Sequence, residues 1–165
     1  VMLLTSTMLG EDAANDGNRK LDEYNEFLRQ LTREDDLVLV DLSADMHREV
    51  AAKVAAGRQA GTLLTGDGLH MNPLGNVMMA RGVLRGFGFT DEQLAKLDAR
   101  WEAFPVNPGY PYQLLKDRPI TLRQYRELDA IAAKRGGISA IQLLSNTPPA
   151  ELEPILVSIG VAPKP

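Results

Sequence analysis

The chain contains 165 residues, of which 44% are hydrophobic and 5% aromatic, and its formal net charge at pH 7 is −4. This length can bury the aliphatic core of one domain or slightly more, whereas the acidic balance argues against a basic nucleic-acid-binding face, so we expect no nucleic-acid partner. The absence of cysteine excludes disulfides, thiolate metal ligands and a cysteine nucleophile. No segment approaches the ~18 consecutive apolar residues that span a membrane, so no membrane partner is expected.

The N-terminal part follows the pattern of a strand, a helix and a second strand. The short apolar run 1–5 is typical of a buried parallel strand, and apolar side chains recur at helical spacing over about 19–34. A second apolar run, 37–40, ends at Asp41. This order of elements favours a parallel sheet with a right-handed crossover. Because the first strand is already under way at Val1, we expect the chain to be part of a longer protein.

Two further helices and a polar loop follow. Ser43 is placed to cap a helix that runs to Gly57. After the loop 62–72, Pro73 occupies a position that is favoured in the first turn of a helix, and we expect that helix to end near Arg85.

The composition then changes, and the remainder, 90–165, is a predicted helical extension. Capping-box patterns begin at Thr90 and at Thr121, each with a glutamine three residues later. The apolar segment 138–144 is ambiguous between helix and strand. We therefore divide the chain into an α/β part, 1–89, and the helical extension.

The run 66–76 is rich in glycine and places Asp67 three residues before His70, one of two histidines in the chain. A carboxylate at this spacing can reach the imidazole, hold its orientation and stabilise its charged form, as general-base chemistry requires. Gly68 lacks a Cβ and so gives the turn the necessary conformational freedom. The plain alternative for an isolated Asp-x-x-His pair is a structural turn with a capping aspartate and a solvent-exposed histidine.

The stretch that begins at Asp67 resembles the Asp-x-x-His block of the SGNH (GDSL-type) hydrolases, a family made up mostly of esterases and lipases. Asn72 and Gly75 keep the spacing of the family's asparagine and glycine, whereas Pro73 follows the asparagine instead of preceding it. The resemblance implies that His70 is the general base and that Asp67 orients it.

The same resemblance implies a fold and an activity. Residues 1–89 would be the C-terminal half of the three-layer α/β/α, flavodoxin-like sandwich of these enzymes, with parallel strands, and 90–165 would be an addition to it. The activity would be hydrolysis of a carboxylic ester, preferably a carbohydrate acetyl ester, by a serine nucleophile with no metal or organic cofactor. A bacterial periplasmic or secreted location is also suggested, while the residues themselves leave the compartment open.

The serine nucleophile of the family is not found in this chain. No serine lies in a Gly-Asp-Ser or Gly-x-Ser-x-Gly context, and the Gly-x-Asn-Asp block that supplies oxyanion donors is absent too. The run 66–69 looks like Gly-Asp-Ser-Leu with glycine in place of serine, but His70 follows at once, so the last block of the family matches better. We therefore expect the chain to be inactive alone and to need the missing N-terminal half of the same protein as its partner. The serines considered are Ser6, Ser43, Ser139, Ser145 and Ser158.

An alternative comes from a different class of protein. In it the chain is a non-catalytic interaction module whose extension, 90–165, binds a protein partner. The aromatic residues Trp101, Tyr110 and Tyr112 either line a sugar-binding surface or pack around the proline-rich connector 105–111.

Overall fold

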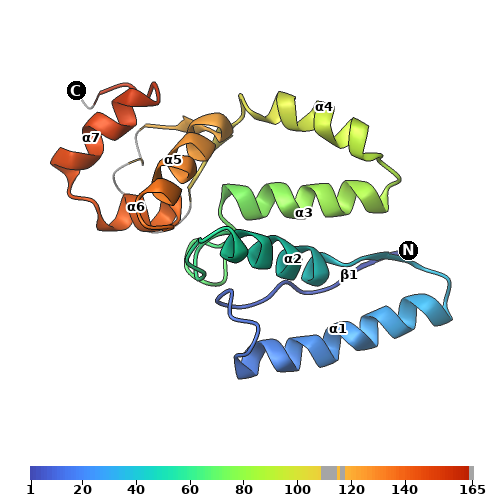
Figure 1. The fold of residues 1–165 in the computed structure, drawn as a ribbon. Coiled ribbons are helices and arrows are strands. Elements are labelled where there is room, and N and C mark those ends of the chain that lie inside the picture. Colours follow the sequence, from blue (N-terminus) through green and yellow to red (C-terminus); the bar gives the residue numbers. More distant parts are fainter. Residues whose placement is uncertain (109–114, 116–117, 164–165) are drawn as a thin grey trace.

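The computed structural model describes residues 1–108, 115 and 118–163. These residues form a mixed α/β structure that is mostly helical and contains a small parallel sheet and a short antiparallel pair of strands (Figure 1). None of the helices within the described ranges is long and apolar enough to cross a membrane.

The parallel sheet consists of two strands, β1 (Met2–Leu4) and β2 (Val38–Val40), whose first residues lie opposite each other. The helix α1 (Asp16–Glu34) connects them, so the predicted strand–helix–strand unit with parallel pairing is present. The helix begins earlier than the expected residue 19, because the Asn15 side chain accepts a hydrogen bond from the amide of Asn18 and caps the helix there.

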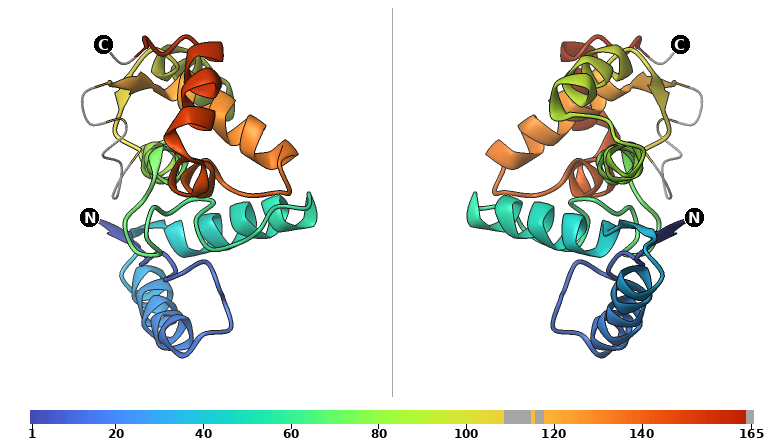
Figure 2. Two further views of the ribbon diagram at one scale, coloured as in Figure 1. Left: turned by 90° about the vertical axis from the view of Figure 1, so that its left-hand side faces the viewer. Right: turned by 90° about the vertical axis from the view of Figure 1, so that its right-hand side faces the viewer.

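Helices cover both faces of this sheet. The helix α1 contacts both strands from one side, and α3 (Pro73–Gly86) lies against β2 from the other, with α2 (Leu42–Ala55) beside it (Figures 1 and 2). Two glycines of α3 permit the close approach: a Cβ at Gly86 would lie 2.5 Å from a methyl carbon of Val40, and one at Gly82 would lie 2.7 Å from a methyl carbon of Leu42. The two parallel strands therefore lie between α1 on one face and α3 on the other.

The residue that caps α2 is Asp41. Its carboxylate accepts a hydrogen bond from the amide of Ala44 and is fixed by the hydroxyl of Thr5 and by two nitrogens of Arg29, at 2.8 and 3.0 Å. The expected cap, Ser43, is instead buried inside the first turn, where its amide donates to the Thr5 hydroxyl. That expectation was wrong because a carboxylate held at the end of β2 already covers the helix N-terminus.

The second part of the chain is helical, with one short pair of antiparallel strands that was not expected. Capping boxes form at Thr90 and Thr121, as predicted, and a third one at Ser139 starts a helix, so the ambiguous segment 138–144 is mostly helical. The elements are α4 (Asp91–Trp101), β3 (Pro105–Val106), β4 (Ile120–Thr121), α5 (Leu122–Lys134), α6 (Ala140–Asn146) and α7 (Pro149–Ser158).

Most buried apolar side chains of the described residues fall into two clusters. One lies between α2 and the loop 61–72 and includes Met46, Val50 and Leu64. The other belongs to α5, α6, α7 and their connections. Leu74 of α3 packs against both clusters, which are thereby joined through one helix.

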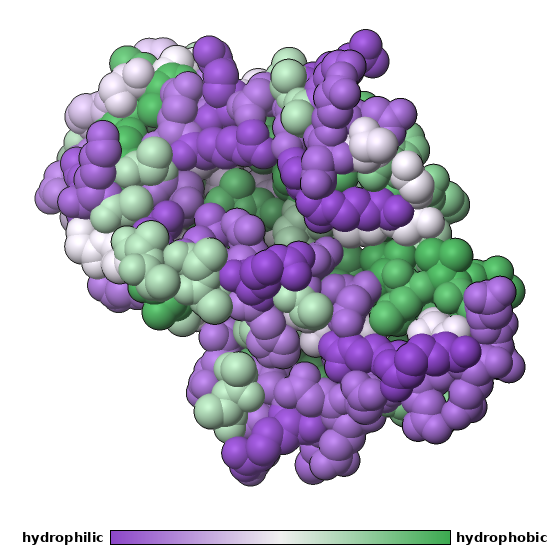
Figure 3. Space-filling view, turned by 45° about the vertical axis from the view of Figure 1, so that its right-hand side comes forward, coloured by the Kyte–Doolittle hydropathy of each residue, from purple (hydrophilic) through white to green (hydrophobic). Residues whose placement is uncertain are grey.

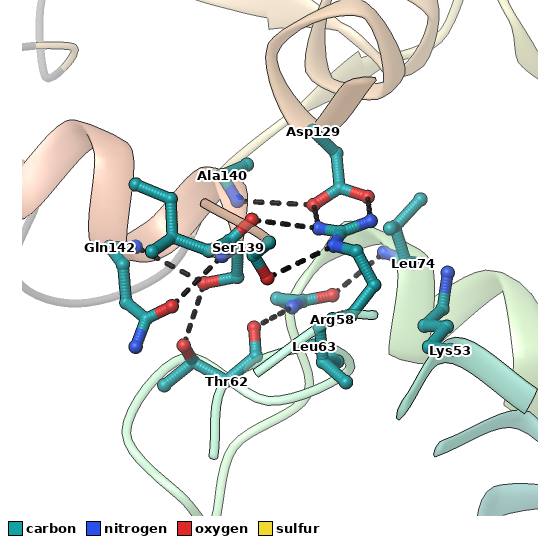
Figure 4. Close-up of polar contacts among 12 residues, drawn as sticks. Lys53, Arg58, Thr62, Leu63, Leu74, Asp129, Ser139, Ala140 and Gln142 are labelled. Atoms are coloured by element: carbon teal, nitrogen blue, oxygen red, sulfur yellow. Dashed lines mark hydrogen bonds and ion pairs between the residues drawn. The ribbon is translucent and has the colours of Figure 1, made fainter. Parts of the chain in front are cut away.

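A buried ion pair also fastens the extension to the first part of the chain (Figure 4). Arg58 donates hydrogen bonds to both carboxylate oxygens of Asp129, at 3.0 and 2.7 Å, and to the carbonyl of Ile138. Beside this pair the hydroxyls of Thr62 and Ser139 lie 2.7 Å apart. The extension therefore packs against the segment 58–62 of its own chain.

Candidate active site

The run 65–71 is a closed turn. Thr65 and Met71 form an antiparallel bridge, and the amide of Gly66 donates a hydrogen bond of 2.7 Å to the carbonyl of His70. The two ends of the turn are thereby held side by side, and the residues between them project as a short loop.

This turn brings the two side chains singled out in the sequence into contact. Nδ1 of His70 lies 2.8 Å from Oδ2 of Asp67, and Oδ1 of the same carboxylate accepts hydrogen bonds from the amides of Leu69 and His70, at 3.0 and 2.8 Å. Gly68 adopts φ +87°, in the left-handed region that glycine enters without a Cβ penalty.

These hydrogen bonds hold the pKa of the Asp67 carboxyl far below its usual range. The amide of His70 contributes most, followed by the imidazole of His70 and the amide of Leu69. The carboxylate is therefore ionised at neutral pH. When it accepts the Nδ1 proton of the neutral imidazole, Nε2 is left as the nitrogen that can take up a proton.

The described residues provide no nucleophile for this pair. The His70 side chain is 79% exposed, and of the side chains in the described ranges only that of Asp67 is hydrogen-bonded to it. Several candidate serines have other partners: Ser139 caps α6, Ser158 donates to a backbone carbonyl, and Ser43 is buried in α2. This part of the chain thus presents a base and the acid that orients it.

The asparagine and glycine of the block have structural roles. Asn72 is buried, and its Oδ1 accepts hydrogen bonds from the amides of Leu74 and Gly75, which caps α3, while its Nδ2 donates to two carbonyls of the preceding loop. A Cβ at Gly75 would overlap the carbonyl oxygen of Leu64. Pro73 occupies the first helical position, as predicted. The block therefore fixes the turn to the start of α3.

One carboxylate near this turn was missed in the sequence. Glu11 is buried and accepts hydrogen bonds from the backbone of the loop that leads into the turn. Its partners lie 50 to 54 residues later in the chain. No local spacing connects such distant positions, so a single sequence carries no signal for this contact.

Two hollows lie beside α3. The smaller, of about 340 Å³, is lined mostly by apolar side chains of α3, α4 and β3, among them Trp101 and Phe104. The larger, of about 590 Å³, is lined by charged side chains that include the Arg58–Asp129 pair. The other two aromatic residues considered for a sugar-binding surface, Tyr110 and Tyr112, lie outside the described residues. Within the described ranges no three His, Cys, Asp or Glu side chains gather as metal ligands.

No protein-family model matches this sequence, and no curated protein matches it either. Among solved structures, an acetylxylan esterase from Geobacillus stearothermophilus is similar, with a TM-score of 0.47 and 22% sequence identity. The alignment covers 54% of this chain and 38% of the esterase, so this chain spans well under half of that protein's length. At this level the likeness concerns the fold of part of each chain and does not bear on what this chain does.

Proposed function

We propose that residues 1–89 carry the acid–base half of the active site of a serine ester hydrolase of the SGNH type. His70 is the general base, and Asp67 orients it. The observation that supports this most directly is the contact of 2.8 Å between Nδ1 of His70 and Oδ2 of Asp67.

In the proposed reaction, Nε2 of His70 takes the proton of a serine hydroxyl while the serine oxygen attacks the ester carbonyl. The resulting imidazolium, stabilised by Asp67, then gives this proton to the departing alcohol, and an acyl-serine remains. Water then attacks the acyl carbonyl while it loses a proton to the same nitrogen, and the imidazolium returns this proton to the serine oxygen as the acid leaves. The serine and the donors that stabilise the oxyanion would come from the N-terminal half of the protein.

The free edge of β1 is the proposed attachment point for that half. Within the described residues, β1 has β2 on one side and no strand on the other. Apolar side chains of both strands are exposed, among them Leu4 and Val38, as are Phe87 and Phe89 after α3. Figure 3, which turns the side with the N-terminus forward, shows a contiguous apolar area on the surface. A further parallel strand at this edge would satisfy its backbone groups and cover apolar surface.

The proposed substrate is a neutral carboxylic ester, and a carbohydrate acetyl ester is preferred. The smaller hollow beside α3, of about 340 Å³, suits an uncharged ligand, because none of its lining residues is charged. Trp101 and Phe104 offer ring faces on which a sugar can stack. Trp101 is the one tryptophan of the chain, so its fluorescence reports on ligands that enter this hollow.

The test compares the chain with a longer one that contains Gly-Asp-Ser and Gly-x-Asn blocks upstream. We expect no turnover of p-nitrophenyl acetate by the chain alone, since losing a triad nucleophile costs on the order of 10⁶ in rate. The longer chain should hydrolyse this ester and acetylated xylan, and His70→Ala should abolish both activities. His47→Gln, at the other histidine, is the control and should retain them. Turnover by the isolated chain, or a longer chain indifferent to His70→Ala, would refute the proposal.

The interaction module is the second candidate. In it the extension, 90–165, binds a protein partner, and the exposed apolar side chains of Phe104 and Val157 in that extension favour it. It requires that the upstream coding sequence contain neither block, whereas the esterase requires both.

A further inference from the structure

Glu11 is a buried carboxylate whose two oxygens are surrounded by backbone amides. The residue as a whole is 3% exposed. One oxygen accepts hydrogen bonds from the amides of Gly61 and Leu63, at 2.9 and 2.8 Å, and the other from those of Leu64 and Thr65, at 2.6 and 2.9 Å. The hydroxyl of Thr65 is a fifth donor, and it shares its single proton between the carboxylate and the carbonyl oxygen of Gly61, each at 3.1 Å.

This arrangement compensates the burial of a charge without a cation. A buried carboxylate is unfavourable unless its lone pairs are satisfied, and converging backbone amides form the concave kind of site that binds anions. Here the anion is supplied by the chain itself. Because four of the five donors belong to the backbone, the carboxylate fixes the path of the loop 61–65 and not merely the side chains along it.

The backbone conformation of Glu11 is a second indication that its contacts are important. Glu11 has φ +56°, a left-handed conformation that is disfavoured for a residue with a Cβ. Such a conformation persists where surrounding contacts determine it. The preceding Gly10 has φ +68°, and its amide donates a hydrogen bond of 2.7 Å to the carbonyl of Gly68, inside the Asp-x-x-His turn.

Residues 10–11 therefore hold the turn of His70 at two places. Gly10 bonds to its middle, and Glu11 bonds to Thr65, which pairs with Met71 at its base. The Cα of Gly10 would lie 3.4 Å from a Cβ at Gly68, so the two loops are also in close contact.

We propose that Glu11 is a positioning residue for the Asp67–His70 pair. Its carboxylate holds the loop 61–65 in the path that places the imidazole against the aspartate. Glu11 itself takes no part in proton transfer. The inference rests on the proposed role of His70, but it concerns the geometry of the pair, which can be measured without any ester.

The experiment is ¹⁵N NMR of the chain labelled at histidine. His70→Ala identifies the signals of His70, and those of His47 serve as an internal reference for folding. In the unmodified chain, we expect neutral His70 to be mainly the tautomer with its proton on Nδ1, the nitrogen 2.8 Å from Asp67. Glu11→Gln places an amide NH₂ among amide donors, so we expect this preference to be lost. Glu23→Gln, on the exposed side of α1, removes the same charge and should leave the tautomer unchanged.

Two milder variants cover the possibility that Glu11→Gln does not fold. Thr65→Val removes the hydroxyl donor and leaves all four amides, and Glu11→Asp keeps the charge on a side chain one methylene shorter. Both should reduce the Nδ1–H fraction, less than Glu11→Gln does. An unchanged tautomer in these folded variants, or an even mixture in the unmodified chain, would overturn the inference. If the longer chain lacks esterase activity but Glu11→Gln still changes the His70 tautomer, only the proposed function is refuted, and the positioning role of Glu11 stands.

Discussion

Two pairs of an aspartate and a basic side chain lie in opposite surroundings in this chain. Asp67 and His70 are three residues apart, and 79% of the histidine side chain is exposed, whereas Arg58 and Asp129 are 71 residues apart with side chains that are each 11% exposed. An exposed pair contributes little to stability but leaves a nitrogen accessible to a substrate. Removing one member of a buried pair lowers the free energy of unfolding strongly, because it leaves an unpaired charge in the interior. The exposed Asp67–His70 pair is therefore suited to chemistry, whereas the buried Arg58–Asp129 pair stabilises the structure.

The largest expected effect comes from breaking the buried pair. Asp129→Ala leaves the Arg58 guanidinium buried without its carboxylate, and we expect a loss of about 3–5 kcal/mol in the free energy of unfolding, measured with urea. The control is Asp91→Ala, which removes the partner of Arg85 at a position where the aspartate side chain is 82% exposed, and it should have a minor effect. Similar losses in the two variants would show that the Arg58 pair does not join the two parts of the chain.

A second pair of variants tests the close contact between the loop after α5 and the loop after α2. Gly136 and Gly137 both have positive φ, +89° and +76°, but a Cβ at Gly137 would overlap the carbonyl oxygen of Gly57, whereas one at Gly136 would meet nothing within 4 Å. We expect Gly136→Ala to cost about 1 kcal/mol through backbone strain and Gly137→Ala about 2–3 kcal/mol through strain and overlap. Equal melting temperatures for the two variants would argue against the close contact.

Acid titration tests a third charge cluster, at the end of β2. Hydrogen bonds from Arg29, and to a lesser extent from Ala44 and Thr5, lower the pKa of Asp41 from 3.8 to about 2. The folded pKa is the lower one, so the stabilisation is complete above about pH 4 and is lost as the pH falls towards 2. We expect a contribution on the order of 2 kcal/mol, and Asp41→Asn should flatten this part of the stability profile. An unchanged profile would show that Asp41 is not the responsible group.

The smallest effect on stability is expected at the exposed pair. Asp67→Asn should shift the urea midpoint only slightly, because the His70 side chain is 79% exposed and an asparagine oxygen can still accept the bonds from the amides of Leu69 and His70, yet it should remove the preference of His70 for the Nδ1–H tautomer. In a longer, active chain the same substitution should lower kcat by about 10⁴, as expected for loss of the orienting carboxylate. A marked drop in stability without a change in tautomer would instead favour the structural turn.

Local patterns predicted much of this fold. The parallel strand–helix–strand unit, the capping boxes at Thr90 and Thr121 and the helix that starts at Pro73 follow from periodicity and from contacts within one turn. The spacing of Asp67 and His70, with the left-handed Gly68 between them, likewise makes their contact possible. Whether they perform the proposed chemistry stays a prediction.

Only the tertiary structure decided the contacts between distant residues. Glu11 meets amides 50 to 54 residues away, Arg58 meets Asp129, and Asp41 takes the capping position expected of Ser43 because Arg29 and Thr5 hold it there. Hydrophobic period and capping signals are properties of a short window of sequence, whereas these partners are selected by how helices and loops pack. The sequence alone therefore determined the local elements and the spacing that lets Asp67 reach His70, while packing determined what holds that pair in place.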